Sequence, residues 1–364
     1  MASATAVLSP HADVILPRMK LPLPDFTVPL PPFEVPEGQQ RLIQFREALR
    51  EAMSEEMRRD KRIFLLGEEV AQYNGAYKIS QGMLDEFGPK RIIDSPISEN
   101  GFAGLAVGAA MYGLKPIIEF MSWSFSLVAA DQILNNVPKM LYMSGGQWGC
   151  PVVFRGNDGA GGQLGSTHSW CVEGLYSNVP GVKIVIPSNP YDAKGLLIAA
   201  IECDDPVIFL EPKRQYHAEK AELDESVEPG PLWQSRVVRR GQDVTVLAYG
   251  PTVKVALKAA EAAAGEGRSL EVIDLRTLSP LDMGPVLESV RRTGRAVVVH
   301  EAHVNLGLGA ELAARITESC FYCLEAPVLR VGGFDTPYPP ARIEEDFLPD
   351  LDRLLDAVDR TFDF

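Results

Sequence analysis

The sequence predicts an α/β protein of two domains, each built on a mainly parallel sheet. Helical and strand patterns alternate along most of its 364 residues. The strand patterns are apolar on both faces, as in a sheet covered by helices on both sides. The alternation lapses once, between Lys213 and Gly241, where charges and prolines replace it. We therefore predict a first domain before this break and a smaller one after it.

The chain opens with a Pro-rich segment that no helix would tolerate. Residues 22–36 read PLPDFTVPLPPFEVP, and proline removes both a main-chain donor and helical freedom. A disordered leader is the plainest interpretation. The predicted organisation is an extension over 1–40, a first domain over 41–215, a linker over 216–240 and a second domain over 241–364.

The first domain begins with an amphipathic helix over 44–59, because its apolar residues recur at helical spacing. A strand is predicted next, over 63–69. Further strands are predicted over 116–120, 152–155, 182–187 and 207–210, with helices over 130–143 and 191–201. Parallel strands joined by helices are the expected result.

The second domain repeats the pattern on a smaller scale. Strands are predicted over 244–249, 270–275, 296–300 and 327–331, and helices over 253–264, 280–292 and 310–319. His300 and His303 come after the apolar strand residues 296–299, and we predict that both lie in a loop near a subunit interface.

Composition narrows the classes of function. Lys plus Arg number 35 against 49 Asp plus Glu, a formal charge of −14, which disfavours a nucleic-acid surface and favours a basic protein partner. No apolar run predicts a membrane span, and the N-terminus lacks the pattern of a secretory signal. Five cysteines predict no disulfide framework, and Cys320 with Cys323 lacks a second ligand pair for zinc. A cytoplasmic enzyme is predicted.

One carboxylate stands out. Glu99 precedes fourteen uncharged residues, 100–113, rich in Gly and Ala, which predicts a closely packed helix in a core. Ser95, Pro96 and Ser98 are helix-entry residues. Glu99 is then either a cap for free main-chain amides or a group that needs a hydrogen-bond partner from elsewhere, such as a ligand nitrogen.

Three long motifs occur in order: GEEVAQYNGAYKIS at 67–80, SPISENGFAG at 95–104 and EFMSWSFSLVAADQI at 119–133. Shorter ones follow, including THS at 167–169, DPVIFLEPK at 205–213 and TGRAVVVHEA at 293–302. On these motifs, from Arg41 to the C-terminus, the chain resembles the beta subunit of the thiamin-dependent decarboxylating component of 2-oxo acid dehydrogenase complexes. The resemblance implies a pyrimidine-binding domain over 41–215 and a transketolase-like C-terminal domain over 241–364.

The resemblance implies roles for four residues. Glu99 would hydrogen-bond the pyrimidine nitrogen of thiamin diphosphate and so activate it. Phe125 would lie against the pyrimidine ring, and Ile97 would touch it through its backbone. His168, in GSTHSW, would donate a proton during acyl transfer to the lipoyl disulfide. Without the resemblance, Phe125 would be interpreted as a core aromatic residue. His168 would be interpreted as a structural histidine without a catalytic role.

Magnesium is expected to come through another chain. Relatives hold magnesium and diphosphate through a GDG segment that this chain lacks, and GNDGAGG at 156–162 is better interpreted as a Gly-rich loop beside the site. The chain would thus carry half a cofactor site, completed by an alpha subunit. The resemblance also implies a potassium ion, held by the main-chain carbonyls of Val152, Ala200, Ile201, Cys203 and Asp205. An ordinary helix end is the alternative.

The predicted function is that of a 2-oxo acid dehydrogenase beta subunit, active in a heterotetramer of two alpha and two beta subunits. Implied partners are that alpha subunit and the basic subunit-binding domain and lipoyl domain of a dihydrolipoyl acyltransferase. Pyruvate is the favoured substrate, with branched-chain 2-oxo acid and acetoin dehydrogenases as alternatives. A self-sufficient transketolase-like synthase and a noncatalytic scaffold are the rivals from other classes.

Overall fold

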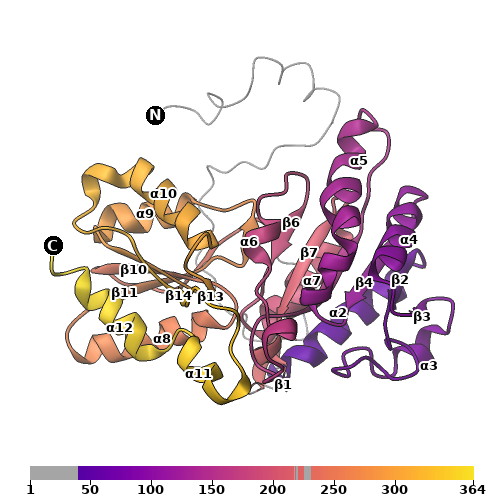
Figure 1. Ribbon diagram of the computed structural model, residues 1–364, viewed down its shortest axis with the longest axis horizontal. Coiled ribbons are helices and arrows are strands. Elements are labelled where there is room, and N and C mark those ends of the chain that lie inside the picture. Colours follow the sequence, from indigo (N-terminus) through magenta and orange to yellow (C-terminus); the bar gives the residue numbers. More distant parts are fainter. Residues whose placement is uncertain (1–39, 217, 219, 225–230) are drawn as a thin grey trace.

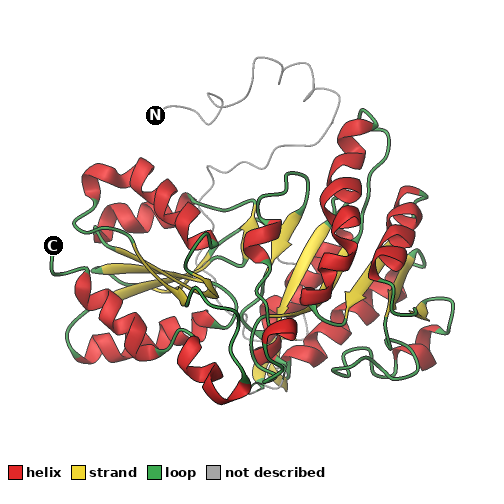
Figure 2. Ribbon diagram, viewed as in Figure 1, coloured by secondary structure: helices red, strands yellow, loops and turns green. Residues whose placement is uncertain are grey.

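The computed structural model describes residues 40–216, 218, 220–224 and 231–364 (Figure 1). The predicted extension over 1–40 therefore lies outside the described residues, except for Gln40. Two sheets stand side by side, each with helices on both faces (Figure 2). The predicted fold class, two α/β domains with largely parallel sheets, is confirmed.

The N-terminal sheet has seven strands in the order β12-β6-β7-β5-β4-β2-β3. Its parallel strands are β2 (Ile63–Gly67), β3 (Ile92–Asp94), β4 (Lys115–Phe120), β5 (Val153–Asp158), β6 (Lys183–Val185) and β7 (Val207–Pro212). The covering helices include α2 (Phe45–Arg59), α3 (Met83–Phe87), α4 (Glu99–Met111), α5 (Val137–Met143), α6 (Glu173–Tyr176) and α7 (Pro190–Glu202). Strands β2, β5 and β7 are buried along their whole length. This burial explains the apolar sequence of β2 and of most of β7, whereas β5 carries the buried polar residues Arg155, Asn157 and Asp158.

The C-terminal sheet has five strands in the order β14-β13-β10-β11-β9. They are β9 (Arg236–Arg239), β10 (Val244–Ala248), β11 (Leu270–Asp274), β13 (Ala296–His303) and β14 (Leu329–Gly333), with only β9 antiparallel. Helices α8 (Thr252–Gly265), α9 (Gly284–Thr293), α10 (Leu308–Cys320), α11 (Glu344–Phe347) and α12 (Leu351–Arg360) complete the domain. In Figure 2, helices flank this sheet above and below.

Three segments differ from expectation. The predicted helix over 130–143 is preceded by a 3₁₀ helix, η2 (Trp123–Ala129), and divided into a π-helical turn, η3 (Gln132–Asn136), and α5. Pro138 lacks the N–H that a regular helix would use here. The stretch 216–240 contains β8 (Ala221–Asp224), which pairs with β1 (Gln40–Ile43), and also β9. Strand β12 (Thr277–Ser279) crosses to pair with β6 of the N-terminal sheet.

The prediction that His300 and His303 lie in a loop is wrong, because both belong to β13. Sequence periodicity ended the strand at the first polar residue, whereas the sheet continues through it. His300 is fully buried, and its Nδ1 donates to the carbonyl of Ala302 at 2.9 Å. Gly309 makes room for the ring, since a Cβ at this position would lie 2.7 Å from the His300 Nε2.

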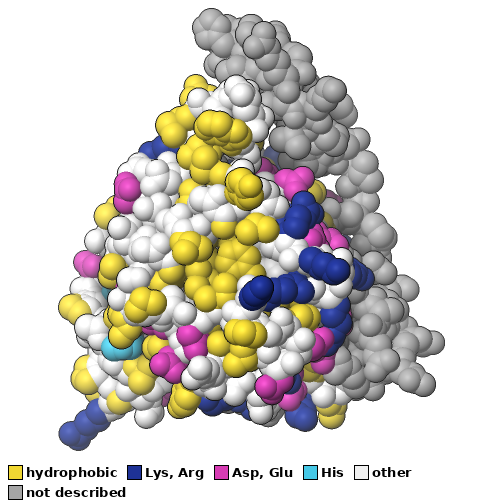
Figure 3. All heavy atoms as spheres, turned by 90° about the vertical axis from the view of Figure 1, so that its right-hand side faces the viewer, with side chains coloured by type: hydrophobic (Ala, Val, Ile, Leu, Met, Phe, Trp, Pro, Cys, Tyr) yellow, Lys and Arg dark blue, Asp and Glu magenta, His cyan; other side chains and the backbone are white. Residues whose placement is uncertain are grey.

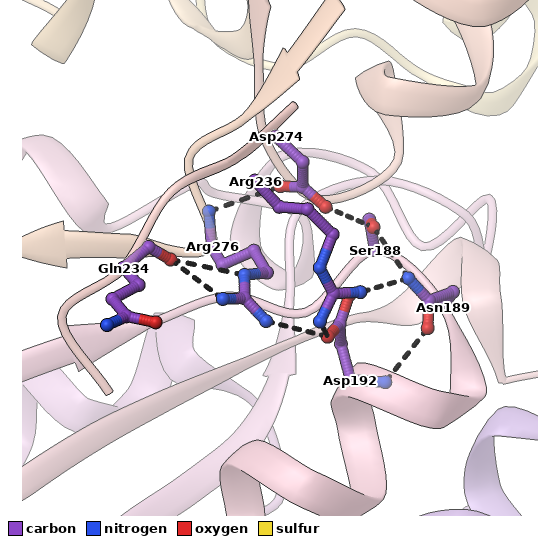
Figure 4. A network of polar contacts seen from close by, with 7 residues as sticks. All are labelled: Ser188, Asn189, Asp192, Gln234, Arg236, Asp274 and Arg276. Atoms are coloured by element: carbon purple, nitrogen blue, oxygen red, sulfur yellow. Dashed lines mark hydrogen bonds and ion pairs between the residues drawn. The ribbon is translucent and has the colours of Figure 1, made fainter. Parts of the chain in front are cut away.

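A polar network joins the two domains (Figure 4). Asp192, in the first turn of α7, pairs with Arg276 at 2.9 Å and with Arg236 at 3.0 Å. Asn189 caps the same helix by accepting from the Asp192 N–H at 2.8 Å. Asp274 accepts from the Arg276 N–H at 3.1 Å. We call the set Asp192, Arg236, Asp274 and Arg276 the junction network.

Candidate active site

Glu99 is the first residue of α4 and only 7% of it is exposed. Ser98 makes no side-chain capping bond. Within the described part of the chain, the Glu99 carboxylate accepts no hydrogen bond, so it does not act as the cap that one interpretation of the sequence offered. Helix α4 packs on η2 and η3, and a Cβ at Gly104 would lie 3.3 Å from the Gln132 amide. The small residues thus allow this close packing, as the sequence predicted.

Glu68 is a second buried carboxyl beside Glu99, and sequence reasoning missed it. It follows β2 directly, is 6% exposed, and its Oε1 has no hydrogen-bond partner in the described structure. Burial raises the pKa of Glu68, and the negative charge of Glu99 raises it further. Glu68 lies in the GEEV motif, but nothing in one sequence separates it from the exposed Glu69.

Phe125 and His168 come from separate motifs, and the structure brings them together. Their rings meet edge to face, with centroids 5.0 Å apart and an interplanar angle of 89°. Both side chains are half-buried. Phe125 belongs to η2, against which α4 packs, so these two residues and Glu99 are carried by adjoining elements. Ile97, by contrast, is 83% exposed just before α4.

His168 ends a short 3₁₀ helix, η4 (Ser166–His168), held at several points. The Lys213 ammonium donates to the His168 carbonyl at 2.6 Å. The Ser166 hydroxyl donates to the carbonyl of Tyr338 in the C-terminal domain. The Thr167 hydroxyl lies 2.8 Å from His168 Nδ1. If that hydroxyl donates, the proton of the neutral ring resides on Nε2.

The Gly-rich segment 156–162 is divided between strand and loop. Gly156 lies within β5, and a Cβ there would sit 2.3 Å from the Phe120 carbonyl of the neighbouring strand. Gly161 has φ 117°, and a Cβ would meet the backbone of Arg214 at 2.7 Å. These glycines are therefore required by close approach of backbones, and the segment ends beside the residues that follow β7.

The five carbonyls predicted to bind potassium come from the end of α7, the residues after it and the residue just before β5. Val152, Ala200 and Ile201 are buried, while Cys203 and Asp205 are half-buried. The Lys115 ammonium donates to the Ile201 carbonyl at 3.2 Å. A positive charge is thus favoured at this helix C-terminus, as the helix dipole requires.

Taken together, the adjoining elements present a buried carboxylate pair, an aromatic ring and an imidazole at one edge of a parallel sheet. This arrangement suits an enzyme that holds a ring-containing cofactor and moves protons. The two domains match, in order, "Transketolase, pyrimidine binding domain" over residues 41–219 and "Transketolase, C-terminal domain" over residues 234–354. Fold and site therefore define a transketolase-like chain.

The sequence relatives narrow this class. The chain is 48% identical to the pyruvate dehydrogenase E1 component subunit beta of Rickettsia bellii, over 87% of this chain and 97% of the relative. It is 48% identical to the Rhizobium meliloti subunit, over 86% of this chain and 68% of the relative. It is 46% identical to the mitochondrial beta-2 subunit of Oryza sativa, over 86% of this chain and 85% of the relative. The chain belongs to the family of pyruvate dehydrogenase E1 component beta subunits. This result confirms the resemblance seen in the sequence. It also confirms the prediction that the chain is a component of an oxidoreductase.

A solved structure supports the fold. The chain of a split-gene transketolase, described as an inactive beta4 tetramer, superposes with a TM-score of 0.70 at 22% identity, covering 88% of this chain and 98% of that one. At that identity the likeness shows the fold alone. Among the described helices, none has the length and apolar character needed to cross a membrane.

Proposed function

We propose that this chain supplies the half of a thiamin diphosphate site that holds the pyrimidine ring. With a separate alpha subunit it would carry out oxidative decarboxylation of pyruvate and reductive acylation of a lipoyl group. The observation that carries the proposal is the Glu99 carboxylate, buried at the start of α4 and without a hydrogen-bond donor in the described structure. A mostly buried carboxylate without a donor is available to a ligand that can donate.

The residues present fit this cofactor. Thiamin diphosphate supplies the electron sink for decarboxylation. Glu99 would hold a proton between its carboxylate and the pyrimidine nitrogen, in a site where burial strengthens the hydrogen bond. Phe125 would pack against the ring and Ile97 would contact it through its main chain. Magnesium and the diphosphate would be held by the alpha subunit.

His168 would be the proton donor to the lipoyl disulfide. Its half-buried ring is held against Phe125, and the Lys213 contact fixes its main chain. In its protonated form, His168 can give its Nε2 proton to one sulfur as the disulfide opens, while the other sulfur accepts the acyl group. His168 would thus act after decarboxylation, whereas Glu99 would act before it.

The alpha subunit would cover the face that carries α4. Large apolar side chains are exposed on and beside α4 and α5, including Ile97, Leu105, Tyr112, Tyr142 and Met143. Hydrophobic side chains gather at the centre of this end of the molecule (Figure 3). Exposed apolar surface of this extent is typical of an interface. Covering it would also bury Ile97, which the proposed site requires.

Further parts of the proposal rest on the family and on charge. The formal charge of −14 favours the basic subunit-binding domain of a dihydrolipoyl acyltransferase, whose lipoyl domain would visit the site. Potassium would bind the carbonyls near the end of α7, where it would have to replace the Lys115 ammonium at the Ile201 carbonyl. A cytoplasmic location completes the proposal.

Calorimetry tests the shared site. The isolated chain should bind thiamin diphosphate weakly, and the assembly of two alpha and two beta subunits should bind it tightly with magnesium. Tight, stoichiometric, magnesium-dependent binding by this chain alone would instead support a self-sufficient synthase. A panel of 2-oxo acids and acetoin, assayed with the assembly, tests the substrate. Turnover of branched-chain acids without pyruvate would contradict the choice of pyruvate.

A second assay separates the two proposed acid/base residues. His168→Ala should lower lipoyl acylation far more than decarboxylation measured with an artificial electron acceptor, because His168 would act after decarboxylation. Thr167→Val, which removes only the hydroxyl contact to Nδ1, should show the same bias more weakly. Equal losses in both assays for His168→Ala would mean that His168 is not the lipoyl proton donor.

A further inference from the structure

A small acidic pocket lies beneath the His168 loop, where the two domains meet. It is lined by Asp158 at the end of β5, Cys171, Glu173 at the start of α6 and Glu301 of β13, with Tyr249 closing one side. Its volume is ≈ 10 Å³, the space of a single water-sized occupant. None of these residues has a role in the proposed thiamin site.

Three of these side chains converge. One ligand atom from each of Asp158, Cys171 and Glu173 lies within 4.8 Å of the others. The Val172 N–H donates to Asp158 Oδ1 at 3.3 Å, which draws the two segments together. Small side-chain rotations would bring the three atoms to metal-ligand separations.

The carboxylate of Glu173 has one oxygen without a hydrogen-bond partner in the described structure. Only 1% of this residue is exposed, and its Oε1 accepts from the Tyr249 hydroxyl at 3.0 Å. Its Oε2, on the same pocket-lining carboxylate, has no hydrogen-bond partner in the described structure. A buried carboxylate oxygen without a partner costs free energy unless a proton or a cation satisfies it.

The local charges favour a cation. Three carboxylates, those of Asp158, Glu173 and Glu301, line the pocket. Arg214 pairs with Glu301 at 3.5 Å but also with Glu345 at 3.4 Å, and Lys213 donates its ammonium to the His168 carbonyl. Within the described structure, Asp158 and Glu173 therefore have no salt-bridge partner of their own.

We propose that Asp158, Cys171 and Glu173 form a binding site for one zinc-like divalent cation. A thiolate with two carboxylates favours zinc over magnesium or calcium, which prefer ligand sets made of oxygen alone. Water would complete the coordination. Because Cys171 is three residues after His168, an occupied site ties the His168 loop to β5, and the site shares no residue with the potassium carbonyls.

The test uses the full chain, treated with a chelator and dialysed, with Co²⁺ as a spectroscopic probe. One equivalent should produce a thiolate-to-cobalt charge-transfer absorption that Zn²⁺ abolishes by displacement. Zinc should also raise the unfolding temperature. No absorption and no calorimetric zinc binding would overturn the proposal.

Variants locate the ion. Cys171→Ser should abolish the charge-transfer absorption and weaken binding by on the order of 100-fold or more, since loss of even an outer partner costs 10–100-fold. Cys323→Ser, at an exposed thiol, is the matched control and should change nothing. Glu173→Gln, which keeps an acceptor for Tyr249, should weaken zinc binding without lowering the metal-free unfolding temperature. Retained absorption in Cys171→Ser, or its loss in Cys323→Ser, would place the ion elsewhere.

Discussion

Two buried groups of carboxylates in this protein differ in their counter-charges. In the junction network, Asp192 is held by two guanidinium groups. At the candidate active site, Glu68 and Glu99 lie together without a hydrogen-bonded cation in the described structure. A compensated buried charge stabilises a fold only while its partners remain, whereas an uncompensated one costs stability and is available to a ligand. The first group should therefore control stability and the second activity.

The largest effect should follow from Glu99→Gln. This change keeps size and hydrogen-bonding capacity but cannot share a proton with the cofactor, so decarboxylation by the assembled enzyme should fall by on the order of 10²- to 10⁴-fold. The unfolding temperature should not fall, because no described partner is lost. Glu69→Gln, at the exposed neighbour of Glu68, is the control. Near-normal activity in Glu99→Gln would remove its proposed role.

Asp192→Asn should do the opposite. It leaves the Arg236 and Arg276 guanidinium groups without their shared carboxylate, and breaking a buried pair costs about 3–5 kcal/mol. Denaturant unfolding should show this loss, while the pH dependence of turnover by the protein that remains folded should not change. The control is Glu86→Gln, in an exposed pair with Arg58, where less than about 1 kcal/mol is expected. Equal losses in both variants would mean that the network does not join the domains as we describe.

The comparison extends to a buried base. Burial lowers the pKa of His300 to about 4, with smaller contributions from Arg330 and His303. Because the unfolded chain takes up the proton first, His300 should cost stability as pH falls from about 6.5 to 4, by up to about 3 kcal/mol. His300→Gln should flatten this decline in pH-dependent unfolding, and His303→Gln should not. Parallel curves for wild type and His300→Gln would contradict burial of a neutral imidazole.

The smallest effect is expected at Glu68. Its folded-state pKa is raised, so its ionisation costs stability as pH rises through that value, and the cost is absent at lower pH. Glu68→Gln should therefore be more stable than wild type at neutral pH and equal to it in acid. Cofactor affinity of the assembly should change less than in Glu99→Gln. A variant that is less stable at neutral pH would show that Glu68 makes a favourable interaction absent from the described structure.

Prediction from the sequence succeeded where the signal was local. The amphipathic pattern predicted a helix over 44–59, and α2 spans Phe45–Arg59. The uncharged run after Glu99 predicted a packed helix, and α4 begins at that residue. Prediction failed where a neighbouring strand determines the structure. At His300, pairing with the adjacent strand β14 extends β13 as far as His303. The roles of Glu99, His168, Phe125 and Ile97, and the potassium ligands, remain predictions.

By itself the sequence determined the fold class, the alternation of the main helices and strands, and the family, because periodicity and motifs are read along the chain. Only the tertiary structure decided which distant residues meet. It placed Phe125 on His168, Glu68 beside Glu99, and Asp192 between two arginines of the other half of the chain. It also paired β12 with β6 of the N-terminal sheet and brought together the residues that line the acidic pocket. Such contacts depend on the packing of elements far apart in sequence, and no local pattern of residues encodes them.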